Sequence, residues 1–245
     1  MKKVLYYAAL AILTGVFLFS AYKVGTYFLE QKRSQTDTEE VKQYMQVVPA
    51  QTGDSSAAVE QAPIAVDFEA MKAVNKDIVA WLYVPDTRLN YPIVQAADND
   101  YYLHRLLNGD YNLNGTIFMD YLNHADFSDA NTLIFGHNMK SGNMFGEMTN
   151  YKKQSYYDQH PVAYLLTPTQ NYTLELVAGV ILNDDDAIYQ HSFSQELLDA
   201  CRSHSTFSSN VEATAQDRFV TLSTCSYEYD NARFVVLGKL VPLGS

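Results

Sequence analysis

The hydrophobic pattern divides the chain into an apolar N-terminal run, a polar segment and a long part with strand-like patterning. Lys2 and Lys3 precede an uncharged run over residues 4–22. At about 1.5 Å per residue, a helix of this length approaches the ~30 Å hydrocarbon core of a bilayer. Apolar residues resume after Lys23. We therefore predict that residues 1–30 form a cytosolic tip and a transmembrane signal anchor.

A cleaved signal peptide is the alternative interpretation of this run. Cleavage requires small residues at positions −1 and −3, but a cut after Ala21 puts Phe19 at −3 and a cut after Gly25 puts Lys23 there. An uncleaved, single-pass anchor is favoured. Lysine and arginine flank the run on both sides, so the positive-inside rule gives no clear orientation. The acidic remainder favours a cell-membrane protein whose C-terminal domain is extracellular.

Residues 31–66 are polar and weakly patterned, which predicts an extracellular stalk that is flexible or partly helical. The folded domain is expected over 67–245. Its strand candidates share β-branched and aromatic residues between turn signals, and they are 78–84, 116–120, 132–135, 172–182, 218–224 and 233–241.

Helix signals in the domain are fewer than strand signals. Asp67 can cap a short helix, and 144–151 can form another. Ser192 and Gln195 have the spacing of a capping box before a helix over about 194–203. The strands follow one another without a βαβ rhythm. This pattern predicts a mainly β (α+β) fold, a barrel or sandwich with peripheral helices.

Charge and cysteine content exclude several classes of function. The 28 acidic and 17 basic residues give a net charge of −11, which argues against a nucleic-acid partner. Two cysteines exclude a disulfide scaffold and a four-cysteine zinc site. A loop cluster of acidic residues and one histidine is better explained as solvated polarity than as a metal site: Asp120, His124, Asp126 and Asp129. No cofactor or metal is expected.

The last two predicted strands carry the most informative chemistry. Thr-Leu-Ser-Thr-Cys over 221–225 ends one strand, and Arg233 begins the next after a polar turn. If these strands pair, Cys225 and Arg233 face each other at the mouth of a hairpin. An arginine favours a thiolate and can hold a developing oxyanion. The alternatives are a buried thiol or a disulfide with Cys201, and an exposed Arg233 without a partner.

A cysteine nucleophile also needs a proton-transfer partner. Among six histidines, His137 stands out because Gly136-His137 directly follows the apolar run 133–135. Position alone is a weak signal, since a hydrogen-bonded loop histidine is the commoner case.

Together these residues resemble a sortase, the transpeptidase family of Gram-positive cell surfaces. The Thr-Leu-x-Thr-Cys signature, a strand-Gly-His element, an arginine on the next strand and an N-terminal anchor carry the resemblance. The subclass resembles class B through stretches at 75–82, 98–103, 115–120, 136–139 and 144–145. A helix-bearing insertion over about 182–218 fits class B as well. One departure is the short connection from Cys225 to Arg233, eight positions, which puts detailed specificity in doubt.

The resemblance implies an eight-stranded sortase-type β-barrel with N-terminal helices and the insertion before the cysteine strand. His137, Cys225 and Arg233 match the family's catalytic positions. A substrate groove would be lined by Asn99, Leu103, Ile188, Tyr189, Ser223 and Thr224. The enzyme would cleave a C-terminal sorting signal after its Thr, form a thioester on Cys225, and transfer the protein to an amine.

The implied partners are surface or pilin proteins that bear the signal. The implied acceptor is an amine of the peptidoglycan cross-bridge or a pilin lysine, for cell-wall anchoring or pilus assembly. Two other functions stay open. One is an exported cysteine peptidase or amidase with water as acceptor, and the other is a non-catalytic membrane-tethered binding domain with a Cys201–Cys225 disulfide.

Overall fold

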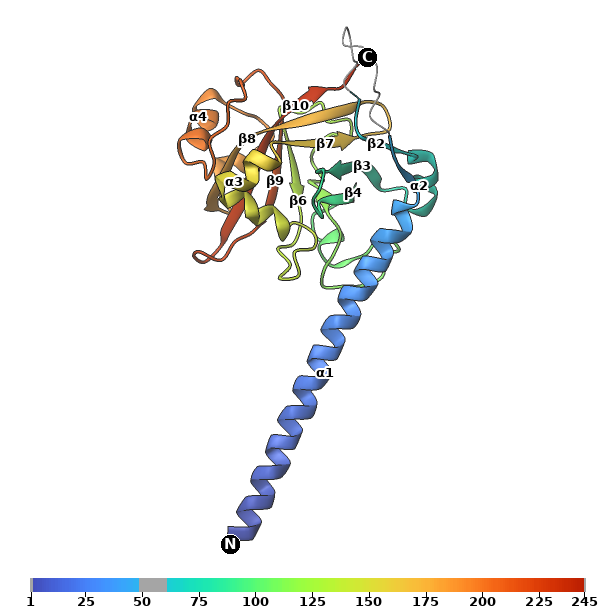
Figure 1. The fold of residues 1–245 in the computed structure, drawn as a ribbon, viewed down its shortest axis with the longest axis vertical. Helices are drawn as coiled ribbons and strands as arrows, with labels where there is room; N and C mark the ends of the chain where they lie inside the picture. The colour runs from blue at the N-terminus through green and yellow to red at the C-terminus, as the bar shows by residue number, and fades with distance from the viewer. Residues whose placement is uncertain (1, 49–60, 245) are drawn as a thin grey trace.

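The computed structural model describes residues 2–48 and 61–244, and the centre of the molecule is a closed β-barrel of eight strands (Figure 1). The barrel strands are β3 Ile78–Tyr83, β4 Asn90–Val94, β5 Phe118–Met119, β6 Asn131–Phe135, β7 Val162–Leu166, β8 Asn171–Asn183, β9 Phe219–Cys225 and β10 Ala232–Pro242. Their order around the barrel is β10-β8-β7-β3-β4-β5-β6-β9, and β9 pairs with β10 to close it. β4–β5 and β6–β9 are parallel pairs, and the other pairs are antiparallel. The predicted mainly β fold with an eight-stranded barrel is confirmed.

Smaller elements surround the barrel. A two-stranded antiparallel sheet joins β1 Met45–Val47 to β2 Ile64–Val66. The helices are α1 Lys2–Lys42, α2 Phe68–Val74, α3 Gln154–Gln159 and α4 Gln195–Ser203, with short 3-10 turns η1 Tyr102–His104, η2 Glu147–Lys152 and η3 Ala187–Tyr189. η3 and α4 lie in the segment between β8 and β9, which is the predicted helix-bearing insertion.

Strand β10 shows why the C-terminal sequence is apolar at consecutive positions. Phe234 and Val236 point into the barrel core, while Val235 and Leu237 pack in a second cluster with Leu198 of α4. A strand covered on both faces needs apolar residues at every position rather than at alternate ones. The insertion therefore covers the outer face of the strand that carries Arg233.

The six predicted strands all correspond to strands of the barrel, but β4 and β7 of the barrel and the small sheet β1–β2 were not predicted. β4 contains Pro92, and a proline argues against a strand inside a sheet because it cannot donate to the ladder. Here Pro92 pairs with Trp81 of β3 in an antiparallel register. β7 is a five-residue strand that directly follows Pro161. It pairs with β8, which follows it in a short hairpin, and with β3, which is distant in sequence.

The helix predictions hold with two corrections. Asp67 caps α2, and its Oδ1 accepts a 3.0 Å hydrogen bond from the Ala70 amide. α4 is capped by Ser194, whose side chain accepts from the Leu197 amide, so the predicted capping role of Ser192 is wrong. The segment predicted as a helix over 144–151 forms the 3-10 turn η2, which begins at Glu147.

Helix α1 differs most from expectation. It continues without interruption through the first part of the predicted stalk, and Gln31, Ser34, Asp37, Thr38 and Val41 are buried against the domain. These positions share one helical face, but four of the five are polar. A hydrophobic pattern does not reveal such a face, because Gln31 and Asp37 are held by hydrogen bonds to loops rather than by apolar contacts. Residues 49–60 of the predicted stalk lie outside the described residues.

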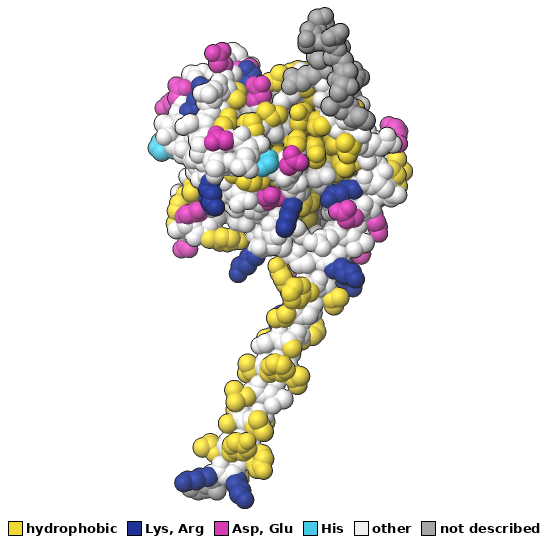
Figure 2. All heavy atoms as spheres, viewed as in Figure 1, with side chains coloured by type: hydrophobic (Ala, Val, Ile, Leu, Met, Phe, Trp, Pro, Cys, Tyr) yellow, Lys and Arg dark blue, Asp and Glu magenta, His cyan; other side chains and the backbone are white. Residues whose placement is uncertain are grey.

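The N-terminal part of α1 projects away from the domain (Figure 1). Figure 2 shows apolar side chains around its exposed length, with lysines at its start. Its most apolar window has a mean hydropathy of 2.0 and buries nothing against the domain. A long apolar helix of this kind is compatible with a membrane anchor, although a signal sequence has the same properties.

Candidate active site

The β9–β10 hairpin brings Cys225 and Arg233 together. In the antiparallel register of these strands Arg233 lies directly opposite Cys225. The turn between them is closed by a hydrogen bond of 2.8 Å from the Ser226 amide to the Ala232 carbonyl. Lys152 of η2 donates to Ser226 Oγ at 2.8 Å and pairs with Glu228 at 2.5 Å. The register predicted from sequence is therefore observed, and the turn beyond it is fixed to the barrel.

His137 follows β6, which runs parallel to β9, so the histidine and the cysteine lie at the same end of two adjacent strands. Three hydrogen bonds connect the strand ends. The Gly136 amide donates to the Ser223 carbonyl at 3.1 Å, Thr224 Oγ1 donates to the Gly136 carbonyl at 2.7 Å, and Asn138 Nδ2 donates to the Cys225 carbonyl at 2.8 Å. Gly136 is required here, because a Cβ would lie 2.8 Å from the Phe145 ring.

The ring of His137 is held by the backbone of η1. Its Nε2 lies 2.8 Å from the Leu103 carbonyl oxygen. A carbonyl only accepts, so Nε2 carries hydrogen and Nδ1 is the ring atom that can take up a proton. Gly115 makes room for this carbonyl: at a φ of +56° its Cβ would lie 2.5 Å from the Leu103 carbonyl oxygen.

The environment of His137 favours the neutral ring. Burial lowers the pKa of His137 below its usual range, the Leu103 carbonyl opposes that shift, and the nearby His104 adds to it. The two imidazoles are stacked at 5.8 Å between centroids and 15° between planes. At this separation, a positive charge on one imidazole disfavours protonation of the other. His137 therefore suits proton exchange rather than permanent charge.

The two cysteines are both free thiols in different environments. Cys225 is half-buried at the end of β9. Cys201 is buried in the cluster between α4 and the barrel, and burial raises its pKa to about 12. The disulfide that a non-catalytic binding domain would need is not formed. This observation opposes the binding-domain alternative.

Arg233 has a defined partner, contrary to the alternative of an unpaired strand charge. Its Nη2 lies 3.2 Å from Asp184 Oδ2, just after β8, and its Nη1 donates to the Ala232 carbonyl at 3.2 Å. The Arg233 side chain remains 28% exposed and lines the cavity described next. The Asp184 contact orients the guanidinium while other N–H groups remain available.

A cavity of about 370 Å³ opens beside these residues. His137, Cys225 and Arg233 all line it, together with five of the six predicted groove residues: Asn99, Leu103, Tyr189, Ser223 and Thr224. Ile188 does not line it. Ile188 is fully buried in the cluster under α4, so its placement in the groove is wrong. In the 3-10 turn η3, Tyr189 faces the cavity and the preceding side chain faces the core.

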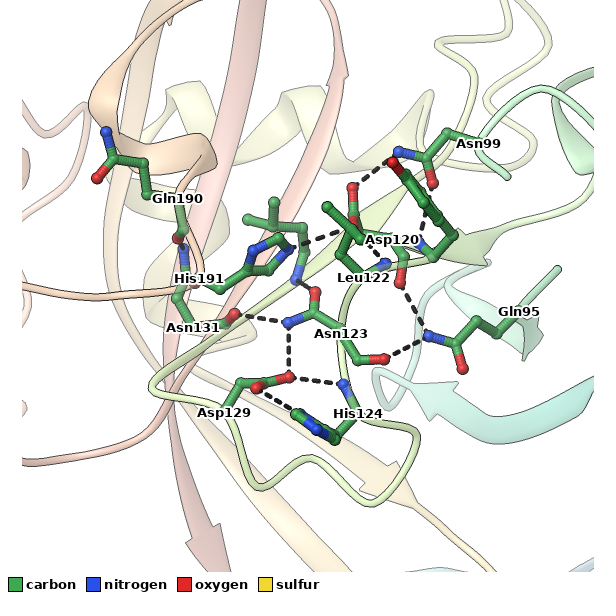
Figure 3. Close-up of polar contacts among 12 residues, drawn as sticks. Gln95, Asn99, Asp120, Leu122, Asn123, His124, Asp129, Asn131, Gln190 and His191 are labelled. Atoms are coloured by element: carbon green, nitrogen blue, oxygen red, sulfur yellow. Dashed lines mark hydrogen bonds and ion pairs between the residues drawn. The ribbon is translucent and has the colours of Figure 1, made fainter. Parts of the chain in front are cut away.

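Tyr189 is fixed over the cysteine strand. Its hydroxyl and Ser223 Oγ share a 2.8 Å hydrogen bond, and burial raises the pKa of Tyr189 to about 12. The η3 segment is held by Asn131, whose Nδ2 donates to the Ile188 and Gln190 carbonyls, each at 2.8 Å. Figure 3 shows Asn131 beside Gln190. Asn131 was not recognised from the sequence, because a single asparagine at a strand start has no distinguishing pattern.

Asp120 connects the two walls of the cavity. Its Oδ2 accepts from Asn99 Nδ2 at 2.7 Å, and its Oδ1 lies 3.2 Å from His191 Nε2, as Figure 3 shows. The Asn99 oxygen accepts from the Tyr121 amide at 3.0 Å, which fixes the orientation of that amide side chain. Asp120 lies within the 115–120 stretch, but the sequence alone did not indicate this role.

The acidic loop cluster is not arranged around a common centre. Asp129 binds His124 Nδ1 at 2.8 Å and Asn123 at 2.8 Å, while Asp120 faces the cavity wall. Asp126 Oδ1 accepts a 3.0 Å hydrogen bond from the Ser128 amide. Within residues 2–48 and 61–244, no group of three or more His, Cys, Asp or Glu side chains could hold a metal ion.

Comparison with known proteins agrees with this geometry. The sortase domain family matches residues 82–241. The chain belongs to the sortase family. It is 35% identical over 237 residues to sortase B of Listeria monocytogenes serovar 1/2a, covering 94% of each chain. The resemblance to class B is confirmed, and membership of the family supports a transpeptidase.

Solved sortase B structures share the fold. The sortase B of B. anthracis in complex with AAEK1 has a TM-score of 0.70 and 32% identity, covering 88% of this chain and 99% of its own. A Staphylococcus aureus sortase B–substrate complex has a TM-score of 0.68 and 32% identity, covering 72% and 85%. A sortase B complexed with triglycine has the same TM-score and identity, covering 72% and 86%.

Proposed function

We propose that this sortase is a cysteine transpeptidase in which Cys225 cleaves a C-terminal sorting signal after its Thr. One observation carries the proposal most directly: a free, half-buried thiol, a half-buried imidazole and a guanidinium line one cavity. Hydrogen bonds hold the imidazole, the guanidinium and the backbone of Cys225, which is the pre-organisation that nucleophilic catalysis requires. The solved sortase B–substrate complex supports a peptide signal as the ligand.

The first half-reaction forms a thioester. The Cys225 sulfur, whose proton has passed to His137, attacks the Thr carbonyl carbon of the bound signal, and a C–S bond forms. The guanidinium of Arg233 donates hydrogen bonds to the oxyanion of the tetrahedral intermediate. The C–N bond then breaks, and His137 protonates the departing amine. The cleaved C-terminal fragment leaves, and the surface protein stays attached to Cys225.

The second half-reaction transfers the protein to an amine. The acceptor nitrogen attacks the thioester carbonyl, His137 accepts its proton, and the sulfur leaves as the C–S bond breaks. A new amide bond forms without ATP, because the thioester retains much of the reactivity of the original bond. The sortase B complexed with triglycine supports a primary amine as acceptor.

The biological acceptor is an amine of the peptidoglycan cross-bridge or a pilin lysine. The first would anchor surface proteins to the cell wall, and the second would assemble pili. The domain would act outside the cell, attached by α1 as a single transmembrane helix. Residues 1–30 would form the tip and anchor, and the following segment would connect it to the catalytic domain that begins near residue 67.

The test measures which nucleophile resolves the thioester. The full chain in detergent micelles is incubated with a panel of Thr-containing sorting peptides, with and without triglycine, and the products are identified by mass spectrometry. The proposal predicts an amide-linked triglycine product that depends on Cys225. Equal rates of hydrolysis with and without the amine, and no ligated product, would favour the peptidase alternative.

A further inference from the structure

The loop at residues 105–114 meets α1 where the apolar part of that helix ends. Asn112 Nδ2 donates to the Glu30 carbonyl at 3.0 Å, and Gln31 Nε2 donates to Asn114 Oδ1 at 3.4 Å. Leu113, between these two asparagines, is 52% exposed, and the neighbouring Tyr111 is 61% exposed. Exposed apolar side chains of the loop therefore lie at the same level as the end of the apolar helix.

The exposure of these side chains is fixed by the loop conformation. Arg105 and Tyr111 form an isolated antiparallel bridge, and the Leu106 amide donates to the Asp110 carbonyl at 3.0 Å. On the side toward α1, the carboxylate of Asp37 accepts the Leu107 amide at 2.8 Å. The loop is thus a rigid turn attached to the helix, and it presents Tyr111 and Leu113 outward.

The helix shows a matching surface at the same level. Phe28 and Leu29 are 65% and 60% exposed just before Glu30. Lys32 and Arg33 are exposed just after it. Tyrosine is enriched at membrane–water interfaces, and basic side chains outside a span attract anionic headgroups. Along α1, the apolar side chains therefore come first, on the hydrocarbon side, and the basic side chains follow on the headgroup side.

The length of the apolar run places this level at the membrane surface. Residues 4–29 are 26 positions in which Lys23 is the single charged residue. They extend for about 39 Å as a helix. This exceeds the ~30 Å hydrocarbon core by roughly 9 Å, so the run reaches the headgroup region on the domain side. A loop hydrogen-bonded to Glu30 and Gln31 lies in that region too.

We propose that loop 105–114 is a second membrane contact, in which Tyr111 and Leu113 enter the lipid headgroup interface beside Phe28 and Leu29. Lys32 and Arg33 then lie at the level of the lipid phosphates. The proposal rests on α1 as a membrane anchor, but not on the chemistry of Cys225. The loop directly follows η1, whose Leu103 carbonyl holds the His137 ring. The contact would therefore keep the cavity at a fixed height above the bilayer.

The test uses tryptophan fluorescence, because the native chain has one tryptophan and it is fully buried. Leu113→Trp, and separately Tyr111→Trp, is introduced into the full chain and reconstituted in phosphatidylcholine–phosphatidylglycerol vesicles. Emission is compared with vesicles whose lipids carry bromine near the headgroup end of the acyl chains. The matched control is Glu196→Trp on α4, an exposed helix position on the part of the domain away from α1 (Figure 1).

The proposal predicts that emission from Leu113→Trp and Tyr111→Trp shifts to shorter wavelength and is quenched by the brominated lipids. Emission from Glu196→Trp should change no more than that of the native chain. Quenching at residues 111 and 113 no greater than at 196 would overturn the proposal, and so would a chain that does not float with the vesicles. Neither result would affect peptide turnover in detergent, which tests the catalytic proposal separately.

Discussion

At the scale of single residues, the two thiols show how the fold assigns different chemistry to one side-chain type. Cys225 lines an open cavity between polar groups, and Cys201 is 4% exposed among apolar side chains. The thiolate is the reactive form, and burial disfavours it. The sequence left a free Cys225 thiol and a Cys225–Cys201 disulfide as alternatives, and the structure shows both thiols free.

This contrast predicts selective alkylation. Brief treatment of the native chain with iodoacetamide should modify Cys225 and leave Cys201 intact, which peptide mapping by mass spectrometry will show. Cys225→Ala should take up no reagent under the same conditions, and Cys201→Ala should react as the native chain does. Modification of Cys201 at a similar rate would mean that the α4 cluster does not protect it.

The guanidinium of Arg233 gives a second prediction. If it donates to the oxyanion, Arg233→Ala should lower kcat by about 10²–10³. Arg233→Lys should recover only part of this loss, since an ammonium lacks the planar fork of donors. Asp184→Asn removes the partner but keeps the guanidinium, and it should have a smaller effect on kcat. A near-normal kcat in Arg233→Ala would contradict the oxyanion role.

The half-buried ring of His137 predicts a pH effect on stability. Its pKa is lower in the folded chain than the unfolded value of about 6.5. The ring is neutral in both states at high pH, but the unfolded state takes up the proton first as pH falls. His137 should thus reduce the free energy of unfolding progressively below about pH 6.5.

Denaturant unfolding at several pH values will measure this effect. Between about pH 7 and pH 5, the native chain should lose more stability than His137→Gln. His124 is a control of opposite sign, because the hydrogen bond to Asp129 raises the pKa of His124. The contribution of His124 to the free energy of unfolding is present at low pH and is lost as pH rises through its raised pKa. His124→Gln should therefore lose more stability on acidification than the native chain, and parallel curves for all three would refute the assignment.

At the scale of elements, the sequence predicted six of the eight barrel strands and missed β4, which contains Pro92, and β7, a five-residue strand that follows Pro161. β10 and β9 were predicted because most of their positions are buried and carry apolar or β-branched residues, which leaves a clear local pattern. The polar connections between elements gave no such pattern. Asn131, Asp120 and Asn138 act through hydrogen bonds to backbone groups or side chains far away in sequence. The placement of Ile188 failed for a related reason, since alternate residues of a short turn face opposite sides.

Asn131 tests whether the η3 segment is held in place by its amide. Asn131→Ala leaves the Ile188 and Gln190 carbonyls and the Thr221 hydroxyl without their partner, so we expect a loss of about 1–3 kcal/mol in stability. Because Tyr189 lies between those carbonyls, KM for the signal peptide should rise as well.

Asn123→Ala provides a matched control for that variant. Asn123 is buried in the same network, but it contacts Asp129, Leu133 and the Asn131 carbonyl and makes no hydrogen bond to η3. We expect Asn123→Ala to lose about as much stability as Asn131→Ala, with little change in KM for the signal peptide. An equal rise of KM in both variants would show that the effect is general loosening rather than displacement of Tyr189.

At the scale of the whole molecule, α1 is a continuous element from the apolar N-terminus to the barrel. The sequence indicated the apolar part by its length and allowed a partly helical stalk after it, but it did not indicate that this polar part packs against the domain. The reason is that Gln31 and Asp37 bind loop amides and side chains rather than an apolar surface. The catalytic domain is therefore attached directly to the helix and not through a flexible stalk over residues 31–42.

The barrel places the thiol, the imidazole and the guanidinium at one cavity by the pairing of β6, β9 and β10. The central claim is that Cys225 forms the covalent intermediate. The most direct measurement is intact-protein and peptide mass spectrometry of the full chain after brief reaction with sorting peptides in the absence of an amine. The account predicts a mass increase equal to the N-terminal peptide fragment up to Thr, carried by Cys225 and removed by hydroxylamine. An adduct on Cys201, or turnover by Cys225→Ala, would contradict it.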